Sequence, residues 1–438
     1  MNTAMKSIVS RLSNAHPASA WLAGIYSICS AHPWVLEAAM RQALADEAPL
    51  LIESTSNQVD QYGGYTGMTP DDFVDFVRAI AERVGFPHEH LILGGDHLGP
   101  NAWRHLAADE AMQRAEALID AYASAGFTKL HLDTSMPCAG EPERLSDAVV
   151  AARASRLCAV AEAAVKRASL SVSPVYVIGT EVPVPGGAAE DLDVVEPTSR
   201  EAAIETAEVH RKAWIDEGIE AAWSRVIALV VQPGVEFDHT KVIDYAPTRA
   251  ERLKSALDAL PGLVFEAHST DYQTPEALSA LVHDGFCILK VGPGVTFALR
   301  EALYALADIE TQLIDASSRS NLRDVVERVM LAKPGYWEKY YHGDAGQQRI
   351  LRTYSYSDRV RYYWSDAEIG AATQTLIDNL GATRIPENLL SQFMPDQYWA
   401  VRRGELENEP MALVQDRIRQ VVRAYAAACR GGGRASGG

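Results

Sequence analysis

Short apolar or β-branched runs recur along the first two thirds of the chain, and each ends in polar or glycine residues. Eight such runs are found: Trp21–Tyr26, Pro49–Glu53, His90–Gly94, Lys129–Asp133, Val175–Gly179, Val226–Gln232, Leu263–Ala267 and Phe286–Val291. Several lack strict alternation, which is typical of parallel strands buried on both faces. The pattern therefore predicts eight buried parallel strands.

Helical patterns lie between these runs. One begins at Thr69, a capping residue, followed by Pro70, which suits the first helical position, and by two acidic residues that favour the helix dipole. The start signal recurs at Thr274-Pro275-Glu276, with Gly285 as a stop signal. Further helices are predicted over residues 107–125, 143–168, 201–217, 247–260 and 296–316.

The alternation of strands and helices implies an α/β protein with a parallel sheet, and eight repeats predict closure into a (β/α)8 TIM barrel. An open doubly wound sheet is the alternative, but no G-x-G-x-x-G follows the first strand. We assign the barrel to residues 15–316. Residues 317–430 are aromatic-rich and helical and are predicted to pack on the barrel as an extension. The glycine-rich residues 431–438 are predicted to be a disordered tail.

The net charge and the cysteine content indicate which partners and which compartment the protein has. The 438 residues carry a formal net charge of −18, which opposes association with nucleic acid or anionic membranes, so an anionic substrate must be held by a local device. The 5 cysteines are widely spaced without a CxxC pair, which is typical of reduced thiols. The sequence shows neither a signal-peptide pattern nor a long apolar run, so we expect a cytoplasmic protein without a membrane span.

The clearest candidate chemistry follows the third strand, in Gly94-Gly95-Asp96-His97-Leu98-Gly99. Active sites of such barrels lie at the carboxyl ends of the strands, so Asp96 is a candidate base and His97 a candidate metal ligand. The alternative is an Asp-His turn satisfied by backbone hydrogen bonds.

A second imidazole, His268, ends the seventh strand, and two histidines at strand ends can share one divalent metal. A buried structural histidine is the alternative. Glu181, after the fifth strand, is a candidate metal ligand or acid/base, although a solvated loop carboxylate is as plausible. Histidine and carboxylate ligands favour zinc, with manganese or cobalt as alternatives.

Glycines after the eighth strand point to phosphate binding. Gly292 and Gly294 precede a helix, so their N–H groups and the helix dipole suit an anion, with Thr296 on the same helix. Ser269 and Thr270 would donate from the neighbouring strand. A plain tight turn is the alternative.

Other polar groups are weaker candidates. Asn57 and Asp133 follow the second and fourth strands and suit sugar hydroxyls, as they also suit ordinary loops. Arg359 and Arg361 could reach over the barrel mouth to a phosphate, and surface ion pairs are the alternative.

Eight strings of this sequence resemble the GatZ/KbaZ family, which contains accessory subunits of class II D-tagatose-1,6-bisphosphate aldolase and ketose 4-epimerases. The strings are STSNQVDQYGGYTGMTP, GGDHLGPNAW, HLDTSMPC, TEVPVPGG, VVQPGVEFDHT, EAHSTDYQT and LKVGPGVTFALREALYAL, with SYSDRVRYYW near the C-terminus. The similarity runs from about residue 15 to residue 425.

The resemblance implies a distant relationship to class II aldolases, in which an Asp base precedes a zinc-binding His on the third strand. Asp96 and His97 match that pattern, and His268 matches a further ligand. The sixth strand here carries Gln232 and no histidine, so the implied three-histidine site is incomplete. Glu181, Gln232 or Asp133 are the candidates to complete it.

Two functions are compatible with the resemblance. The first is metal-dependent C4 epimerisation of D-tagatose 6-phosphate to D-fructose 6-phosphate in carbohydrate, including galactitol, catabolism, by retro-aldol and aldol steps. The second is a non-catalytic subunit that stabilises a class II aldolase catalytic subunit. A sugar-phosphate kinase is disfavoured because the sequence has no G-x-x-x-x-G-K-[ST] loop. We also expect a homo-oligomer.

Overall fold

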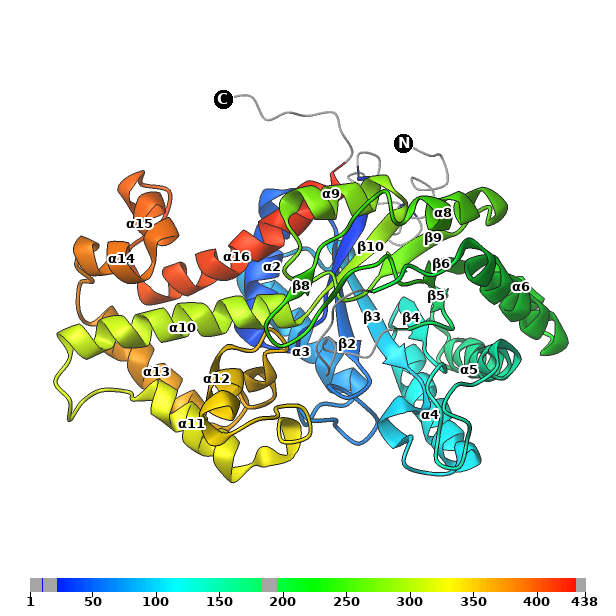
Figure 1. Cartoon of the computed structure of the whole chain (residues 1–438), viewed down its shortest axis with the longest axis horizontal. Helices are drawn as coiled ribbons and strands as arrows, with labels where there is room; N and C mark the ends of the chain where they lie inside the picture. The colour runs from blue at the N-terminus through cyan, green and yellow to red at the C-terminus, as the bar shows by residue number, and fades with distance from the viewer. Residues whose placement is uncertain (1–9, 11–21, 183–194, 431–438) are drawn as a thin grey trace.

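Eight parallel strands close into a barrel in chain order (Figure 1). The computed structural model describes residue 10, residues 22–182 and residues 195–430, so the tail predicted over residues 431–438 lies outside the described residues. The barrel strands are β1 (Ile25–Ile28), β2 (Leu50–Thr55), β3 (Leu91–Leu98), β4 (Lys129–Leu132), β5 (Val175–Ile178), β6 (Val226–Val230), β9 (Val264–Ala267) and β10 (Phe286–Val291). The (β/α)8 prediction is confirmed, with the first strand later than predicted.

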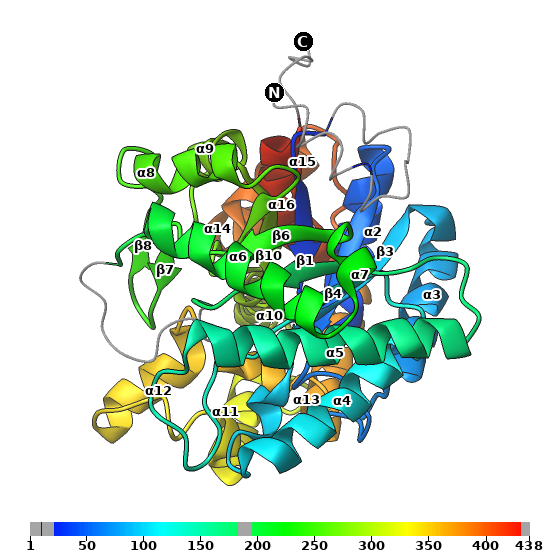
Figure 2. The same ribbon diagram turned by 90° about the vertical axis from the view of Figure 1, so that its right-hand side faces the viewer.

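Helices cover the outside of the strands (Figure 2). Those that follow barrel strands are α2 (Pro33–Ala45), α3 (Pro70–Val84), α4 (Ala108–Ser124), α5 (Asp147–Arg167), α6 (Arg200–Asp216), α7 (Glu220–Trp223), α8 (Glu251–Lys254), α9 (Pro275–His283) and α10 (Pro293–Leu313). The predicted start of α3 is confirmed, because Thr69 and Asp72 form a reciprocal capping box. Helix α2 was not predicted, although His32 caps it and Pro33 begins it.

The inward faces of the strands form layers. Near the amino ends the barrel is filled by apolar side chains that form a cluster of their own, among them Ile25, Leu51, Ile92, Val264 and Ile288. Since side chains two residues apart share a face of a strand, the next inward positions are Ser27, Glu53, Lys129, Glu266 and Lys290. The barrel therefore changes from apolar to charged along its axis.

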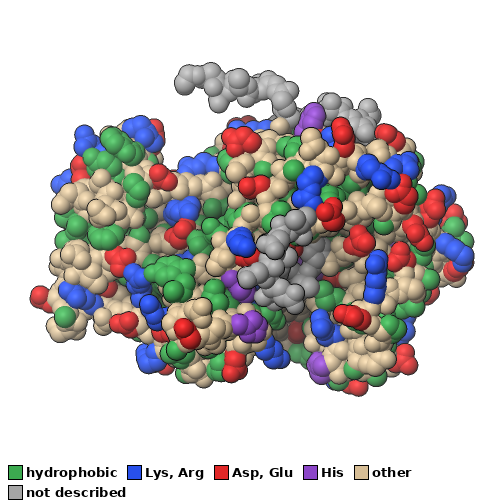
Figure 3. Space-filling model, in the orientation of Figure 1, with side chains coloured by type: hydrophobic (Ala, Val, Ile, Leu, Met, Phe, Trp, Pro, Cys, Tyr) green, Lys and Arg blue, Asp and Glu red, His purple; other side chains and the backbone are tan. Residues whose placement is uncertain are grey.

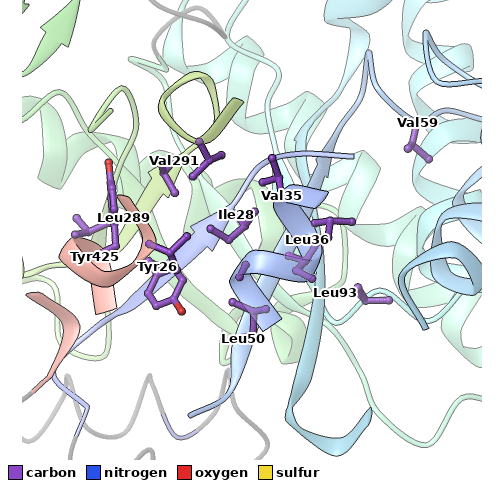
Figure 4. Packing of buried hydrophobic residues seen from close by; sticks show 14 of the residues in the cluster. Tyr26, Ile28, Val35, Leu36, Leu50, Val59, Leu93, Leu289, Val291 and Tyr425 are labelled. Carbon is purple, nitrogen blue, oxygen red and sulfur yellow. The ribbon is translucent and has the colours of Figure 1, made fainter. Parts of the chain in front are cut away.

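The C-terminal third is helical, as predicted: α11 (Leu322–Ala332), α12 (Ala345–Tyr354), α13 (Ala367–Gly381), α14 (Glu387–Phe393), α15 (Pro395–Arg402) and α16 (Pro410–Cys429). Helix α16 returns to the barrel and contacts β1, α2, α9 and α10. Its Tyr425 lies beside Leu289 and Val291 in Figure 4 and donates to the carbonyl oxygen of Thr270 at 2.6 Å. The last helix is thus part of the barrel wall, and the proposed boundary between residues 316 and 317 stays a prediction.

A small antiparallel pair, β7 (Glu236–Phe237) and β8 (Val242–Ile243), follows β6 and was not predicted. Among the described helices, none combines the length and the apolar character that a membrane crossing requires. Acidic and basic side chains are interspersed on the face shown in Figure 3, so that face carries no continuous basic surface.

Candidate active site

A pocket of about 590 Å³, partly open to solvent, lies at the carboxyl ends of the barrel strands. Its walls come from two parts of the chain. The strand ends and the segment after β6 supply Cys29, Thr55, Asn57, Gln58, Tyr65, Asp96, His97, Phe237, His268, Ser269, Asp271, Lys290, Gly292 and Pro293, and the C-terminal part supplies Arg361 and Tyr362. The pocket is therefore completed by the C-terminal part of the chain.

A bulge in β3 turns two adjacent side chains toward this pocket. Successive side chains of a regular strand point to opposite faces, yet Asp96 and His97 both line the pocket. The register between β3 and β4 shifts between Gly95 and Leu98, and His97 adopts a φ of 50°. An extra residue in one strand re-aims its side chains in this way. A left-handed backbone at a non-glycine residue is a strained conformation that is common at functional sites.

Three imidazoles contact one another beside the pocket, and each is held by a carboxylate; His97 and His268 line the pocket, and His131 is fully buried. The Nδ1 atom of His97 lies 2.8 Å from Asp133 Oδ2. The Nδ1 atom of His131 lies 2.9 Å from Asp96 Oδ1. The Nε2 atom of His268 lies 3.0 Å from Glu266 Oε1. The ring centroids are 4.9 to 5.2 Å apart, so the three rings contact one another.

The carboxylates decide which ring nitrogens are free. An ionised carboxylate only accepts hydrogen bonds, so the contacting nitrogens of His97 and His268 carry the proton and their other nitrogens keep the lone pair. The Nδ1 atom of His131 lies between Asp96 Oδ1 and the backbone N–H of His97, which donates to it at 3.2 Å. For His131 the free atom is Nε2, which is buried and has no hydrogen-bond partner within the described part of the chain. A buried imidazole nitrogen without a partner is costly, and a metal ion would satisfy it.

Buried carboxylates and lysines alternate next to the imidazoles. We call this group, Glu53, Lys129, Glu266 and Lys290, the charge ladder. Lys129 is fully buried, and its Nζ lies 2.7 Å from Glu53 Oε1 and 2.7 Å from Glu266 Oε2. Lys290 contacts Glu53 and lies 2.9 Å from Asp96 Oδ1. These pairs cross the barrel between strands distant in sequence, so they fix the positions of the carboxylates that hold His131 and His268.

The same contacts set the protonation states. Burial alone would raise the pKa of Asp96, but the charges of His97 and Lys290 hold that pKa well below its usual value. Burial lowers the pKa of His268 to about 4 despite its bond to Glu266. Burial also opposes the charge of Lys290, yet Asp96 and its other acidic neighbours raise its pKa well above the usual value. At neutral pH Asp96 is therefore ionised, His268 neutral and Lys290 an ammonium ion.

The cluster fits a divalent metal on charge. Its buried charged groups are four carboxylates and two ammonium groups: Glu53, Asp96, Asp133 and Glu266, with Lys129 and Lys290. The carboxylates outnumber the ammonium groups, and Asp96 and Asp133 accordingly raise the pKa of His97 although burial opposes its charge. Excess negative charge is unfavourable in a buried site, and a divalent cation held by the imidazoles would offset it.

A second ligand set overlaps the first. Asp96, His131, Glu266 and His268 offer ligand atoms that all lie within 4.8 Å of one another. His131 and His268 belong to both sets. Within the group of four, His131 and His268 are the clearest candidate ligands, because Asp96 and Glu266 already each contact a lysine and a histidine, whereas His131 keeps an unpartnered nitrogen. His97 lies outside that group, although its ring contacts those of His131 and His268.

Two predicted ligands lie elsewhere. Glu181 accepts from Thr198 Oγ1 at 2.8 Å and lies 3.5 Å from an Arg144 nitrogen, and it does not line the pocket. Gln232 Oε1 accepts from the backbone of Gly234 and so closes its own turn. The structure therefore does not bring Glu181 or Gln232, the predicted metal ligands, to this pocket; Glu266 and His131 lie beside His268 instead. Asp133 is not a free ligand either, because it holds His97 and Ser135.

The predicted phosphate corner is already occupied. The N–H groups of Gly292 and Gly294 donate to Asp271 Oδ1 at 2.9 and 2.7 Å. Thr296 donates to Asp358 at 2.6 Å, and Thr270 donates to the Lys290 carbonyl oxygen at 2.6 Å, so neither hydroxyl is directed at a substrate. This corrects the prediction that these backbone and hydroxyl groups are free to bind phosphate. Among the predicted phosphate-binding residues, Ser269 does line the pocket, and its backbone has a φ of 53°.

The pocket arginine is Arg361 and not Arg359. Arg359 is buried, donates to the Tyr336 carbonyl oxygen at 2.7 Å and stacks over the Tyr340 ring. Arg361 lines the pocket beside Tyr362. Asn57 also lines the pocket, at the end of β2, where the sequence predicted it.

Sequence reasoning missed His131, Glu266, Lys129 and Lys290 as members of the site. One signal could have found them, because each is a polar residue inside an otherwise apolar predicted strand. A charged side chain is almost never fully buried unless it is paired. Several such residues at matching depths therefore predict partners inside the barrel.

Comparisons with known proteins show the family of this chain. A family model described as "D-tagatose-1,6-bisphosphate aldolase subunit GatZ/KbaZ-like" matches residues 8–430. A solved structure from Sinorhizobium meliloti 1021, described as a "probable tagatose 6 phosphate kinase", is 56% identical, with a TM-score of 0.85, and the match covers 93% of this chain and 100% of that one.

More distant solved structures include the fructuronate-tagaturonate epimerase UxaE from Cohnella laeviribosi, with 12% identity, a TM-score of 0.47 and coverage of 93% of this chain and 82% of that one. A fructose-bisphosphate aldolase from Campylobacter jejuni has 13% identity, a TM-score of 0.43 and coverage of 85% and 91%. Similarity at this level carries no conclusion about chemistry.

Proposed function

Since this chain belongs to the GatZ/KbaZ-like family of D-tagatose-1,6-bisphosphate aldolase subunits, we propose that it is itself a metal-dependent enzyme. The proposed reaction inverts C4 of a phosphorylated ketohexose and converts D-tagatose 6-phosphate to D-fructose 6-phosphate. The observation that carries the proposal is the convergence of three carboxylate-bound imidazoles beside Asp96, two of which, His97 and His268, line one pocket with it. A subunit that served only as a scaffold would not need this arrangement.

The C4 hydrogen of a 2-ketose is not acidic, so inversion by deprotonation at C4 is unfavourable, and cleavage of the C3–C4 bond avoids it. Asp96 takes the proton of the C4 hydroxyl, the C3–C4 bond breaks, and its electron pair moves to C3 as the C4 aldehyde forms. The aldehyde rotates and presents its opposite face to C3. The C3–C4 bond then forms again on that face, and Asp96 returns the proton to the C4 oxygen. A divalent metal held by His97, His131 and His268 would supply Lewis acidity at the ketose oxygens.

The geometry argues against the other common aldolase chemistry. A Schiff base requires a neutral lysine, and Lys290 is the lysine that lines the pocket. Its contacts with Glu53 and Asp96 keep it protonated, with a pKa well above the usual value after allowance for burial. Lys290 therefore serves to hold Asp96 and does not attack a carbonyl.

A second candidate function is favoured by the family itself, whose description is that of an aldolase subunit. In that case the chain stabilises a separate class II aldolase catalytic subunit. A kinase role, which the Sinorhizobium protein's description suggests for that protein, is disfavoured here because the sequence has no G-x-x-x-x-G-K-[ST] loop.

One experiment separates these functions. The purified chain is incubated alone with zinc and D-tagatose 6-phosphate, and the sugar phosphates are followed by carbon NMR before and after addition of a chelator. We expect D-fructose 6-phosphate to appear and its formation to stop with the chelator. Absence of conversion, together with stabilisation of a co-expressed aldolase subunit, would establish the subunit role instead.

A further inference from the structure

The glycine corner of the pocket holds a carboxylate that belongs to the chain itself. Asp271 is 3% exposed and lines the pocket, and its Oδ1 accepts from the N–H groups of Gly292 and Gly294 at the start of α10. These N–H groups are the donors that a phosphate would need at this position. A β-carbon added at Gly294 would lie 3.1 Å from Asp271 Oδ1, so the carboxylate is closely fitted to the turn.

A phosphate cannot bind where this carboxylate sits. Both N–H donors are used, and a second anion beside Asp271 would be repelled in a partly desolvated pocket. A hydroxyl is suited to the same place, because a carboxylate accepts hydrogen bonds. The end of the substrate that faces Asp271 should therefore be uncharged.

The part of the pocket wall that comes from the C-terminal region carries a cation. Arg361 donates to the carbonyl oxygens of Ser357 and Asp358 and, at 2.9 Å, to the hydroxyl of Tyr362. Within the described residues it forms no ion pair, whereas Lys290, the pocket's other basic side chain, is paired with Glu53 and Asp96. The pocket thus offers one arginine whose charge is not neutralised by a contacting carboxylate.

We propose that Asp271 is a specificity-determining residue that restricts the pocket to ketoses with a single phosphoryl group. Arg361 receives that phosphate, and Asp271 faces the hydroxyl at the other end of the sugar. A ketohexose 1,6-bisphosphate would place its second phosphate against Asp271 and is rejected. This inference rests on the proposed function, since it assumes that the pocket binds a ketose phosphate.

The test compares binding of D-tagatose 6-phosphate and D-tagatose 1,6-bisphosphate to the zinc-loaded full chain by titration calorimetry. The native protein should bind the monophosphate more tightly by about tenfold or more, as rejection of one anion requires. Asp271→Gly frees two N–H donors and should reduce or reverse this preference. The matched control is Asp271→Asn, which keeps an acceptor oxygen on both N–H groups and so should still exclude the second phosphate. Arg361→Met should weaken binding of the monophosphate.

Equal binding of the two ligands by the native protein would overturn the inference, and so would binding of neither. That comparison needs no variant, so it holds even if Asp271→Gly fails to fold. The experiment also distinguishes failure of this inference from failure of the proposed reaction. A protein that prefers the monophosphate but does not convert it would contradict the proposed reaction and keep the role of Asp271. A protein that converts the monophosphate but binds the bisphosphate as tightly would support the proposed reaction and contradict the role of Asp271.

Discussion

The Nδ1 atom of His131 lies 2.9 Å from Oδ1 of Asp96, and this contact joins the middle of β4 to the bulge of β3. The contact engages Nδ1 of His131, to which the His97 N–H also donates at 3.2 Å, and leaves Nε2 without a hydrogen-bond partner within the described residues. The second oxygen of Asp96 lies 3.7 Å from His97 Nε2. One contact thus joins a proposed metal ligand to the proposed base.

If His131 is a ligand, its removal should release the metal. We expect His131→Gln to lower zinc affinity by at least about tenfold to a hundredfold, measured by metal analysis after dialysis against a weak chelator. The matched control is His210→Gln, since His210 is equally buried but lies on α6, where it contacts the Thr206 carbonyl oxygen. Equal metal loss in both variants would indicate general destabilisation.

Asp96→Asn should separate the base from the ligands. Turnover should fall by about 10²- to 10⁴-fold, the usual contribution of a general base, while zinc still binds at saturating concentration. Steady-state kinetics and metal analysis of the same preparation make the comparison. Asp284→Asn is the control, because Asp284 is a buried carboxylate bonded to Tyr245 away from the pocket. If zinc is lost together with activity, Asp96 is a ligand and the set with Glu266 is the correct one.

The charge ladder should be visible in the stability of the protein. Lys129→Met leaves Glu266 with Lys290 as its remaining lysine, at 3.9 Å, and breaking a buried pair in this way costs about 3–5 kcal/mol. Urea denaturation measures the free energy of unfolding. The double variant Lys129→Met, Glu53→Gln should lose less than the sum of the two single changes, because it removes one unpaired charge.

Lys212→Met serves as the control for that series. Lys212 forms an exposed pair with Asp216 on α6, and exposed pairs contribute little. We expect no measurable change. A loss for Lys129→Met as small as that for Lys212→Met would mean that the interior of the barrel is hydrated.

Acid should destabilise the fold through His210. Burial lowers its pKa from 6.5 to about 4, so the folded state favours the neutral ring more than the unfolded state does. The resulting stability is present above pH 6.5 and is lost as the pH falls toward 4. Between pH 7.5 and pH 5 this amounts to about 2 kcal/mol.

His210→Gln removes that titration. The variant should be less stable than the native protein near pH 7.5, and the difference should shrink at pH 5, as measured by urea denaturation at both values. Parallel pH profiles of the two proteins would show that His210 does not titrate in this range.

The sequence alone determined the elements and several members of the site. Strand runs, the cap at Thr69 and the start signal at Thr274 are written in consecutive residues, so periodicity and capping predict them. Asp96, His97 and His268 were found for the same reason, because the carboxyl ends of barrel strands form the site. Helix α2 was overlooked despite its proline start, because His32 is an unusual cap.

Only the tertiary structure decided the partners. In the sequence, His131 lies within a short apolar strand and is typical of a core histidine. In the structure, β3 places Asp96 beside it. Lys290 meets Glu53 across 237 positions of sequence, through the closure of the barrel. Asp271 accepts hydrogen bonds from the N–H groups of Gly292 and Gly294, which the sequence predicted would bind a phosphate. Local patterns specify where a strand ends, but the register between distant strands specifies which side chains meet, and no single segment contains that information.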